Sequence, residues 1–154
     1  MGKQREIVLS EKKKEIEQLT ELNKSYKLLL KQKGYREALA KLEKSTIVAV
    51  FKSFASKACS RKPTENDWEG LRKAFNIHLP DFYLEIRDAY GLSPLELQTT
   101  LLLCLGISNA DMLYILGKSS QHITNTKKSA NQKIFNDGKA SSLRRNLMQK
   151  LGCF

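Results

Sequence analysis

The sequence has few of the residues that build disulfide, metal or membrane-spanning structures. Its 154 residues include three cysteines, Cys59, Cys104 and Cys153, and two histidines, with no CxxC pair. Scattered thiols in odd number with two imidazoles predict neither a disulfide framework nor a metal site. No apolar run approaches the roughly 20 residues that span a bilayer, and charged sequence rather than a signal peptide follows Met1. We therefore expect a cytosolic chain that binds no metal or other cofactor.

Acidic residues are also too few to balance the basic ones. The chain has 27 lysines and arginines against 16 acidic residues, a formal net charge of +11. Such an excess favours polyanionic partners, with nucleic acid first and an anionic membrane surface second. The two histidines lie far apart in sequence, and we find no phosphate-binding glycine loop and no evident small-molecule site. The expectation is a binding protein and not an enzyme.

The N-terminal segment from about Arg5 to Lys33 is rich in lysine, glutamate and leucine. A heptad frame gives it a first core position, occupied by Leu9, Ile16, Asn23 and Leu30, and a second, occupied by Lys12, Leu19, Tyr26 and Lys33. An Asn in a coiled-coil core can pair with its symmetry mate, which favours a parallel homodimer. The residues predicted to mediate dimerisation are Ile16, Leu19, Asn23, Tyr26 and Leu30. The alternative is a single amphipathic helix that packs on its own domain.

Two breaks divide the N-terminal half. Gly34 is expected to interrupt the first helix, and the apolar spacing of the next segment predicts a second helix from Tyr35 to about Ala58. The polar, basic stretch from Ser60 to Pro63 is the best linker candidate. We therefore expect a helical dimerisation region over residues 1–60 and a second domain over residues 61–154.

The second domain carries a series of helix start and stop signals. The starts are Ser or Thr residues followed three positions later by an acidic residue, and the stops are proline or glycine. The start pairs are Thr64 with Asp67, Ser93 with Glu96 and Ser108 with Asp111, and the stops are Pro80, Gly91, Gly106 and Gly117. A last helix is expected from Ala140 to Leu151, with Arg144 and Arg145 either extending a phosphate contact surface or only adding solubility. No stretch alternates like a strand, so the predicted fold is all-α.

Two of these helices form the arrangement with the clearest functional meaning. A short helix over 108–116, a turn at Gly117 and Lys118, and a helix from Ser119 to Ile134 match a helix-turn-helix, whose second helix lies in the major groove of DNA. In that second helix only Ile123, Ala130 and Ile134 form an apolar stripe. A helix this polar gains little from packing, which favours a hydrated, anionic partner. The alternative is an ordinary solvated face.

The residues of this region resemble a known family. The segments that carry the likeness are 92–96, 103–109, 115–119, 123–125 and 133–134, preceded by 67–71 and 79–82. They look like the LuxR/GerE-type helix-turn-helix, most similar to the C-terminal DNA-binding region of Bacteroidetes tetratricopeptide-repeat transcriptional regulators. The resemblance implies that the chain is the cytoplasmic output end of a longer protein whose upstream region controls the dimer.

The resemblance also assigns roles on the second helix. It implies that Thr124, Asn125 and Lys128 face base edges and that Gln121, His122 and Lys127 lie near phosphates. Asn131 belongs to the same helix, and its side-chain amide is suited to adenine edges. The predicted DNA-binding set is therefore Gln121, His122, Thr124, Asn125, Lys127, Lys128 and Asn131.

Together these features predict a homodimeric regulator that binds double-stranded DNA, with paired recognition helices at half-sites about one helical turn apart. The alternative is a coiled-coil interaction module that recruits proteins such as RNA polymerase without binding DNA. Salt dependence of duplex binding distinguishes the two.

Overall fold

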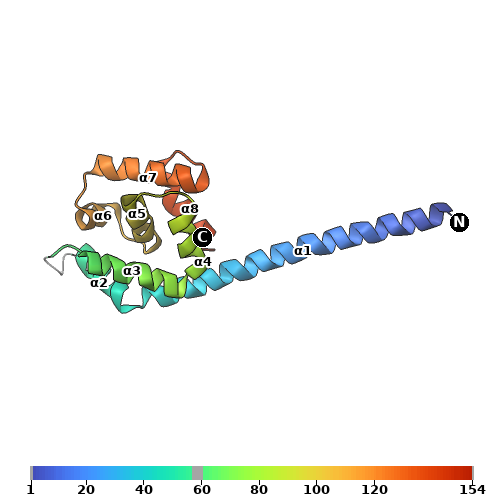
Figure 1. The fold of residues 1–154 in the computed structure, drawn as a ribbon, viewed down its shortest axis with the longest axis horizontal. Coiled ribbons are helices and arrows are strands. Elements are labelled where there is room, and N and C mark those ends of the chain that lie inside the picture. The colour runs from blue at the N-terminus through green and yellow to red at the C-terminus, as the bar shows by residue number, and fades with distance from the viewer. Residues whose placement is uncertain (1, 57–60, 154) are drawn as a thin grey trace. The chain divides into compact units, whose positions relative to one another are not determined.

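A computed structural model describes residues 2–56 and 61–153, with side chains described from Glu6 onward, and this part of the chain is all-helical, as predicted. A long N-terminal helix, α1, precedes a series of shorter ones (Figure 1). The elements are α1 Gly2–Glu43, α2 Thr46–Ala55, α3 Glu65–His78, α4 Pro80–Asp88, α5 Pro94–Cys104, α6 Asn109–Leu116, α7 Ser120–Phe135, the short 3-10 helix η1 Ala140–Ser142, and α8 Leu143–Lys150.

The chain divides into two compact units, one up to Gly34 and one from Tyr35 onward. The first unit is the exposed part of α1, and the second contains the rest of the helices. Side chains of α2, including Phe51 and Phe54, are fully buried in the core of the second unit. The boundary predicted after Ser60 lies at residues 57–60, outside the described part of the chain, as does Cys59.

The expectation that Gly34 ends the first helix is wrong, because α1 continues through it to Glu43. A glycine inside a helix costs only about 1 kcal/mol relative to alanine. This cost is too small to end a helix whose following turns are stabilised by packing. That packing comes from Leu39 and Leu42, which are buried in the core of the second unit. The chain turns at Lys44 and Ser45 instead, before α2.

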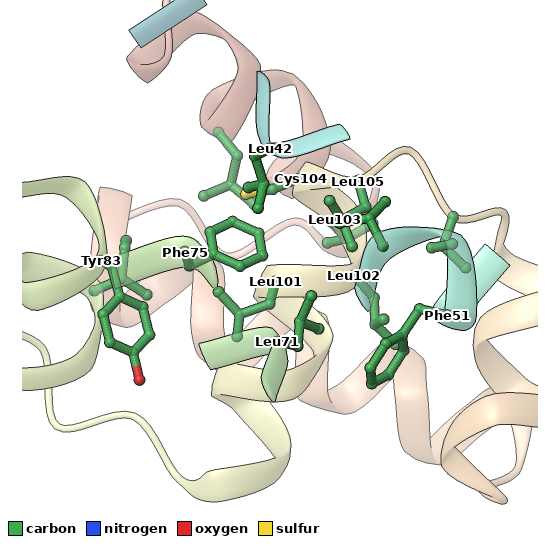
Figure 2. Packing of buried hydrophobic residues seen from close by; sticks show 14 of the residues in the cluster. Leu42, Phe51, Leu71, Phe75, Tyr83, Leu101, Leu102, Leu103, Cys104 and Leu105 are labelled. Atoms are coloured by element: carbon green, nitrogen blue, oxygen red, sulfur yellow. The ribbon is translucent and has the colours of Figure 1, made fainter. Parts of the chain in front are cut away.

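The core of the second unit is built around α5. Five consecutive residues at its C-terminal end, 101–105, are buried, and they pack with apolar side chains from the surrounding helices. Figure 2 shows Phe51 of α2, Leu71 of α3 and Leu101 of α5 in this cluster. The ring of Phe51 also meets Trp68 edge-on at 4.8 Å between centroids, which joins α2 to α3. Because α5 also packs on α7 and α8, this core fixes the helices that carry the candidate site.

The local signals that start helices act as predicted. Thr64 with Asp67 and Ser93 with Glu96 form complete capping boxes at the starts of α3 and α5. Pro80 ends α3 and occupies the first turn of α4, where its missing N–H costs nothing. None of the helices in residues 2–56 and 61–153 is both long and apolar enough to cross a membrane.

Candidate nucleic-acid interface

Three residues set the connection between α6 and α7. The Ser108 hydroxyl caps α6 by accepting a hydrogen bond from the Asp111 N–H at 3.2 Å. Gly117 ends α6 in the left-handed conformation, with φ of 63°, where a side chain would be strained. The Ser119 hydroxyl then caps α7 by accepting from the His122 N–H at 3.1 Å. The turn between the two helices is therefore short and well defined.

The apolar stripe of α7 attaches this helix to the unit. Ile123 and Ala130 are fully buried and Ile134 is half-buried, as the sequence predicted. Thr126 joins the stripe, because its hydroxyl donates to the His122 carbonyl at 2.8 Å and its methyl group is free to pack. The opposite face of α7 is thereby turned to solvent.

The solvent face of α7 is a polar row at helical spacing. Gln121, Asn125, Lys128 and Gln132 recur at intervals of four, three and four residues, and all four are exposed. The Gln121 side-chain amide donates to the Asn125 side-chain oxygen at 3.0 Å. We call these four residues the outward row. Gln132 was not in the predicted set, although the period of the other three extends to it.

A shallow depression of about 520 Å³ lies beside this row, between the N-terminal turns of α5 and α7. His122 is exposed in its wall, whereas Thr124, on the other flank of α7, is half-buried. The residues that line the depression are mostly polar: Ser93, Leu95, Glu96, Ser119, Gln121, His122, Asn125, Thr126 and Ser129. The two predicted residues thus flank the outward row on opposite sides.

Lys127 points toward α6 and not along the outward row. Its Nζ donates to the Asn109 side-chain oxygen at 2.8 Å, a contact between the first turn of α6 and the middle of α7. Burial lowers the pKa of Lys127, and the nearby charge of Arg144 lowers it further. The side chain therefore links the two helices, and its predicted phosphate contact remains a prediction.

Asn131 does not lie on the exposed face, so its predicted contact with DNA is not available in this structure. It is fully buried, and its Nδ2 donates to the Lys139 carbonyl at 2.8 Å and to the Ser142 hydroxyl at 3.3 Å. Its Oδ1 accepts from the Asn146 side-chain amide at 3.0 Å. These bonds satisfy a buried amide and connect α7 to η1 and α8.

A second link joins α7 to the start of α5. Lys133 Nζ lies 2.7 Å from Glu96 Oε1 and 3.3 Å from the Gly91 carbonyl oxygen. Burial acts to raise the pKa of Glu96, but hydrogen bonds from Lys133 and the Ser93 backbone hold it below its ordinary value. A charged Glu96 thus caps α5 and anchors α7 at once.

The surface around α7 is basic. From Gly117 to Phe154 the sequence has eight lysines and arginines and one acidic residue, Asp137. Lys133 and Lys150 form salt bridges with Glu96 and Glu85. Five more are exposed and form no salt bridge within the described residues: Lys118, Lys128, Lys139, Arg144 and Arg145. The positive potential at this surface attracts a polyanion.

The residues predicted to mediate dimerisation are exposed in the first unit. Ile16, Leu19, Tyr26 and Leu30 are 64, 60, 63 and 51% exposed, and Asn23 is exposed as well. Within the described residues no three His, Cys, Asp or Glu side chains come together as a metal site would require. Cys104 is fully buried, and burial raises its pKa to about 12, so it is an unreactive core thiol.

Comparison with known proteins adds no relative. No protein-family model matches the chain, and neither the curated proteins nor the solved structures include a significant match.

Proposed function

We propose that the second unit binds double-stranded DNA by placing α7 in the major groove, and that the protein is a transcription regulator. The observation that carries this proposal is the outward row, an exposed polar face on a helix without a single acidic residue. Two further features support the proposal: the order of a short helix, a tight glycine turn and a second helix in α6 and α7, which a helix-turn-helix shares, and the resemblance of these residues to the LuxR/GerE type.

The chemistry of the row suits the groove. The major groove is about 12 Å wide and admits one helix, and its base edges carry both donors and acceptors. Gln121 and Asn125 can each donate and accept, which matches adenine, and Lys128 can donate to guanine. The exposed N-terminus of α7, capped by Ser119, carries a partial positive charge that favours a phosphate.

The alternative, a protein-interaction module that does not bind DNA, is favoured by one observation, the exposed apolar residues of α1. Those residues lie in the first unit, however, and leave the polar, basic face of α7 without a role. Binding to DNA accounts for that face, so we favour it.

Salt dependence of duplex binding tests the proposal. For the full chain, log affinity for duplex DNA should fall linearly with log salt concentration, with a slope of about 0.9 per neutralised phosphate. Lys128→Ala should weaken binding at least severalfold, because it removes a contact with a base or a phosphate. If the lost contact is with a phosphate, the slope should also decrease by about one. Fluorescence anisotropy over a range of salt concentrations measures both quantities.

Lys73→Ala is the matched control, since it removes the same charge from the exposed surface of α3. Figure 1 shows α5 between α3 and α7, so this variant should bind nearly as the parent does. If duplex binding is absent, or if both variants weaken it equally, the proposed face is wrong.

A further inference from the structure

The first unit leaves an apolar row exposed along α1. It combines the two core positions of the heptad frame, and Ile16, Leu19 and Leu30 are each more than half exposed. Apolar side chains so regularly spaced and so exposed mark a surface that another helix covers. The row consists of eight residues: Leu9, Lys12, Ile16, Leu19, Asn23, Tyr26, Leu30 and Lys33. We call it the α1 seam.

Additional exposed leucines lie along one flank of the seam, and the other flank is polar. Leu22 and Leu29, 65 and 63% exposed, directly precede the first core position of their heptads. The other flank, directly after the second core position, holds Lys13, Thr20 and Lys27. In a parallel pair the leucine flank of one helix meets the polar flank of the other, whereas in an antiparallel pair like flanks meet. The leucines therefore cover each other only in an antiparallel pair.

We propose that the α1 seam binds the α1 seam of a second copy of this chain in antiparallel orientation, with Leu19 opposite Leu30 of the partner subunit. In this register the residue numbers of two facing side chains, one from each subunit, add up to about 49. Leu22 then packs near Leu29 of the partner subunit, which buries the leucine flank.

The charges within the seam agree with this register. In a parallel, aligned pair Lys12 faces its own copy, and so does Lys33, which places like charges together in the core. In the antiparallel register Lys33 lies opposite Ile16 of the partner subunit and beside Glu15 of the partner subunit. Continued along the sequence, the same frame sets Lys12 opposite Glu37 of the partner subunit, an exposed carboxylate.

Asn23 is the residue that favours a parallel pair, because its amide could bond to its own copy across the axis. In the antiparallel register it lies opposite Tyr26 of the partner subunit, a residue that also has a polar end. One Asn thus keeps a polar neighbour, while both seam lysines gain opposite charges. The balance of charges favours the antiparallel pair.

A charge-reversal cycle on the full chain tests both the partner and the orientation. The parent should sediment as a dimer. Lys33→Glu should raise the dimer dissociation constant about tenfold, because it places a carboxylate beside Glu15 of the partner subunit. Adding Glu15→Lys should restore the parent value. Lys24→Glu is the matched control, since this exposed residue lies outside the seam, and it should change the constant less than about twofold.

Two results would overturn the proposal. A parent chain that sediments as a monomer at tens of micromolar removes the second copy as the occupant. A dimer in which Glu15→Lys fails to rescue Lys33→Glu has the wrong orientation, because in a parallel pair the two positions stand 18 residues, about 27 Å, apart along the helix.

Spin-label distances give an independent reading of orientation. In a background with Cys59, Cys104 and Cys153 changed to alanine, a label at Ser10→Cys should lie about 45 Å from its copy in the antiparallel pair and within about 20 Å in a parallel one. A label at Lys24→Cys lies outside the seam but near the midpoint of the paired helices along their length, so its short distance confirms that the dimer persists in this background. A short distance at position 10 would refute the antiparallel register.

Discussion

At the scale of single residues, the side-chain amide of Asn131 joins α7, η1 and α8 through hydrogen bonds to Lys139, Ser142 and Asn146. Replacing it leaves buried partners without their bonds, and such groups cost about 1–3 kcal/mol each. We expect Asn131→Ala to lower the free energy of unfolding by about 2 kcal/mol. Urea denaturation measures this value, with the exposed neighbour Gln132→Ala as a control that should change it by less than about 0.5 kcal/mol. Equal effects of the two variants would contradict the structural role of Asn131.

The carboxylate of Asp137 adds a pH dependence to the same cluster. Hydrogen bonds from the Ser142 hydroxyl, the Asn146 amide and the Lys139 N–H lower the pKa of Asp137. A folded-state pKa below the unfolded one gives stability that is complete above about pH 4 and is lost as the pH falls through the folded value. The stability difference between the parent and Asp137→Asn should therefore shrink as the pH falls from about 6 to about 3. Denaturation at several pH values measures it, and a constant difference would contradict this account.

The sequence predicts which side chains of α7 face solvent better than it predicts which are bound inside. Gln121, Asn125 and Lys128 follow from helical period alone, because the buried stripe fixes the opposite face. Asn131 could not be assigned in this way, since its partners lie 8 to 15 residues further along the chain. A buried polar residue with distant partners resembles an exposed one in sequence.

At the scale of helices, glycine has opposite effects at two positions. Gly117 ends α6 with φ of 63°, and a Cβ there would come within 3.0 Å of the Lys62 ammonium. Gly34 lies inside α1, and a Cβ there would meet nothing within 4 Å. We expect Gly117→Ala to lower stability by about 1 kcal/mol and Gly34→Ala to raise the stability of α1 by up to about 1 kcal/mol.

Thermal denaturation followed by circular dichroism measures both variants. If the two substitutions changed stability in the same direction, the backbone at one of these two glycines would differ from the structure. Gly117→Ala should also weaken any duplex binding, because it disturbs the turn that orients α7.

Helix ends marked by local chemistry could be predicted, and those set by packing could not. The caps at Ser93, Ser108 and Ser119 depend on hydrogen bonds within three residues, so the sequence contains the whole signal. The continuation of α1 past Gly34 depends on the burial of Leu39 and Leu42, which local pattern alone does not show. The same packing explains why the turn comes at Lys44 and Ser45, where no glycine or proline marks it.

At the scale of the whole molecule, the two units suit two different tasks. The first presents an apolar seam and the second a polar, basic face, so the proposed pairing and the proposed DNA binding use separate residues. Loss of one can therefore be measured while the other persists. The all-helical fold followed from the sequence, whereas the division at Gly34 did not, because the helix crosses it without a break.

The central claim is that the outward row of α7 enters the DNA duplex, and amide chemical shifts of the ¹⁵N-labelled chain titrated with duplex DNA test it most directly. The account predicts perturbations concentrated from Lys118 to Gln132, with the largest at Gln121, Asn125 and Lys128. Perturbations confined to α1 or spread over α3 and α4, or no perturbation at low salt, would contradict it.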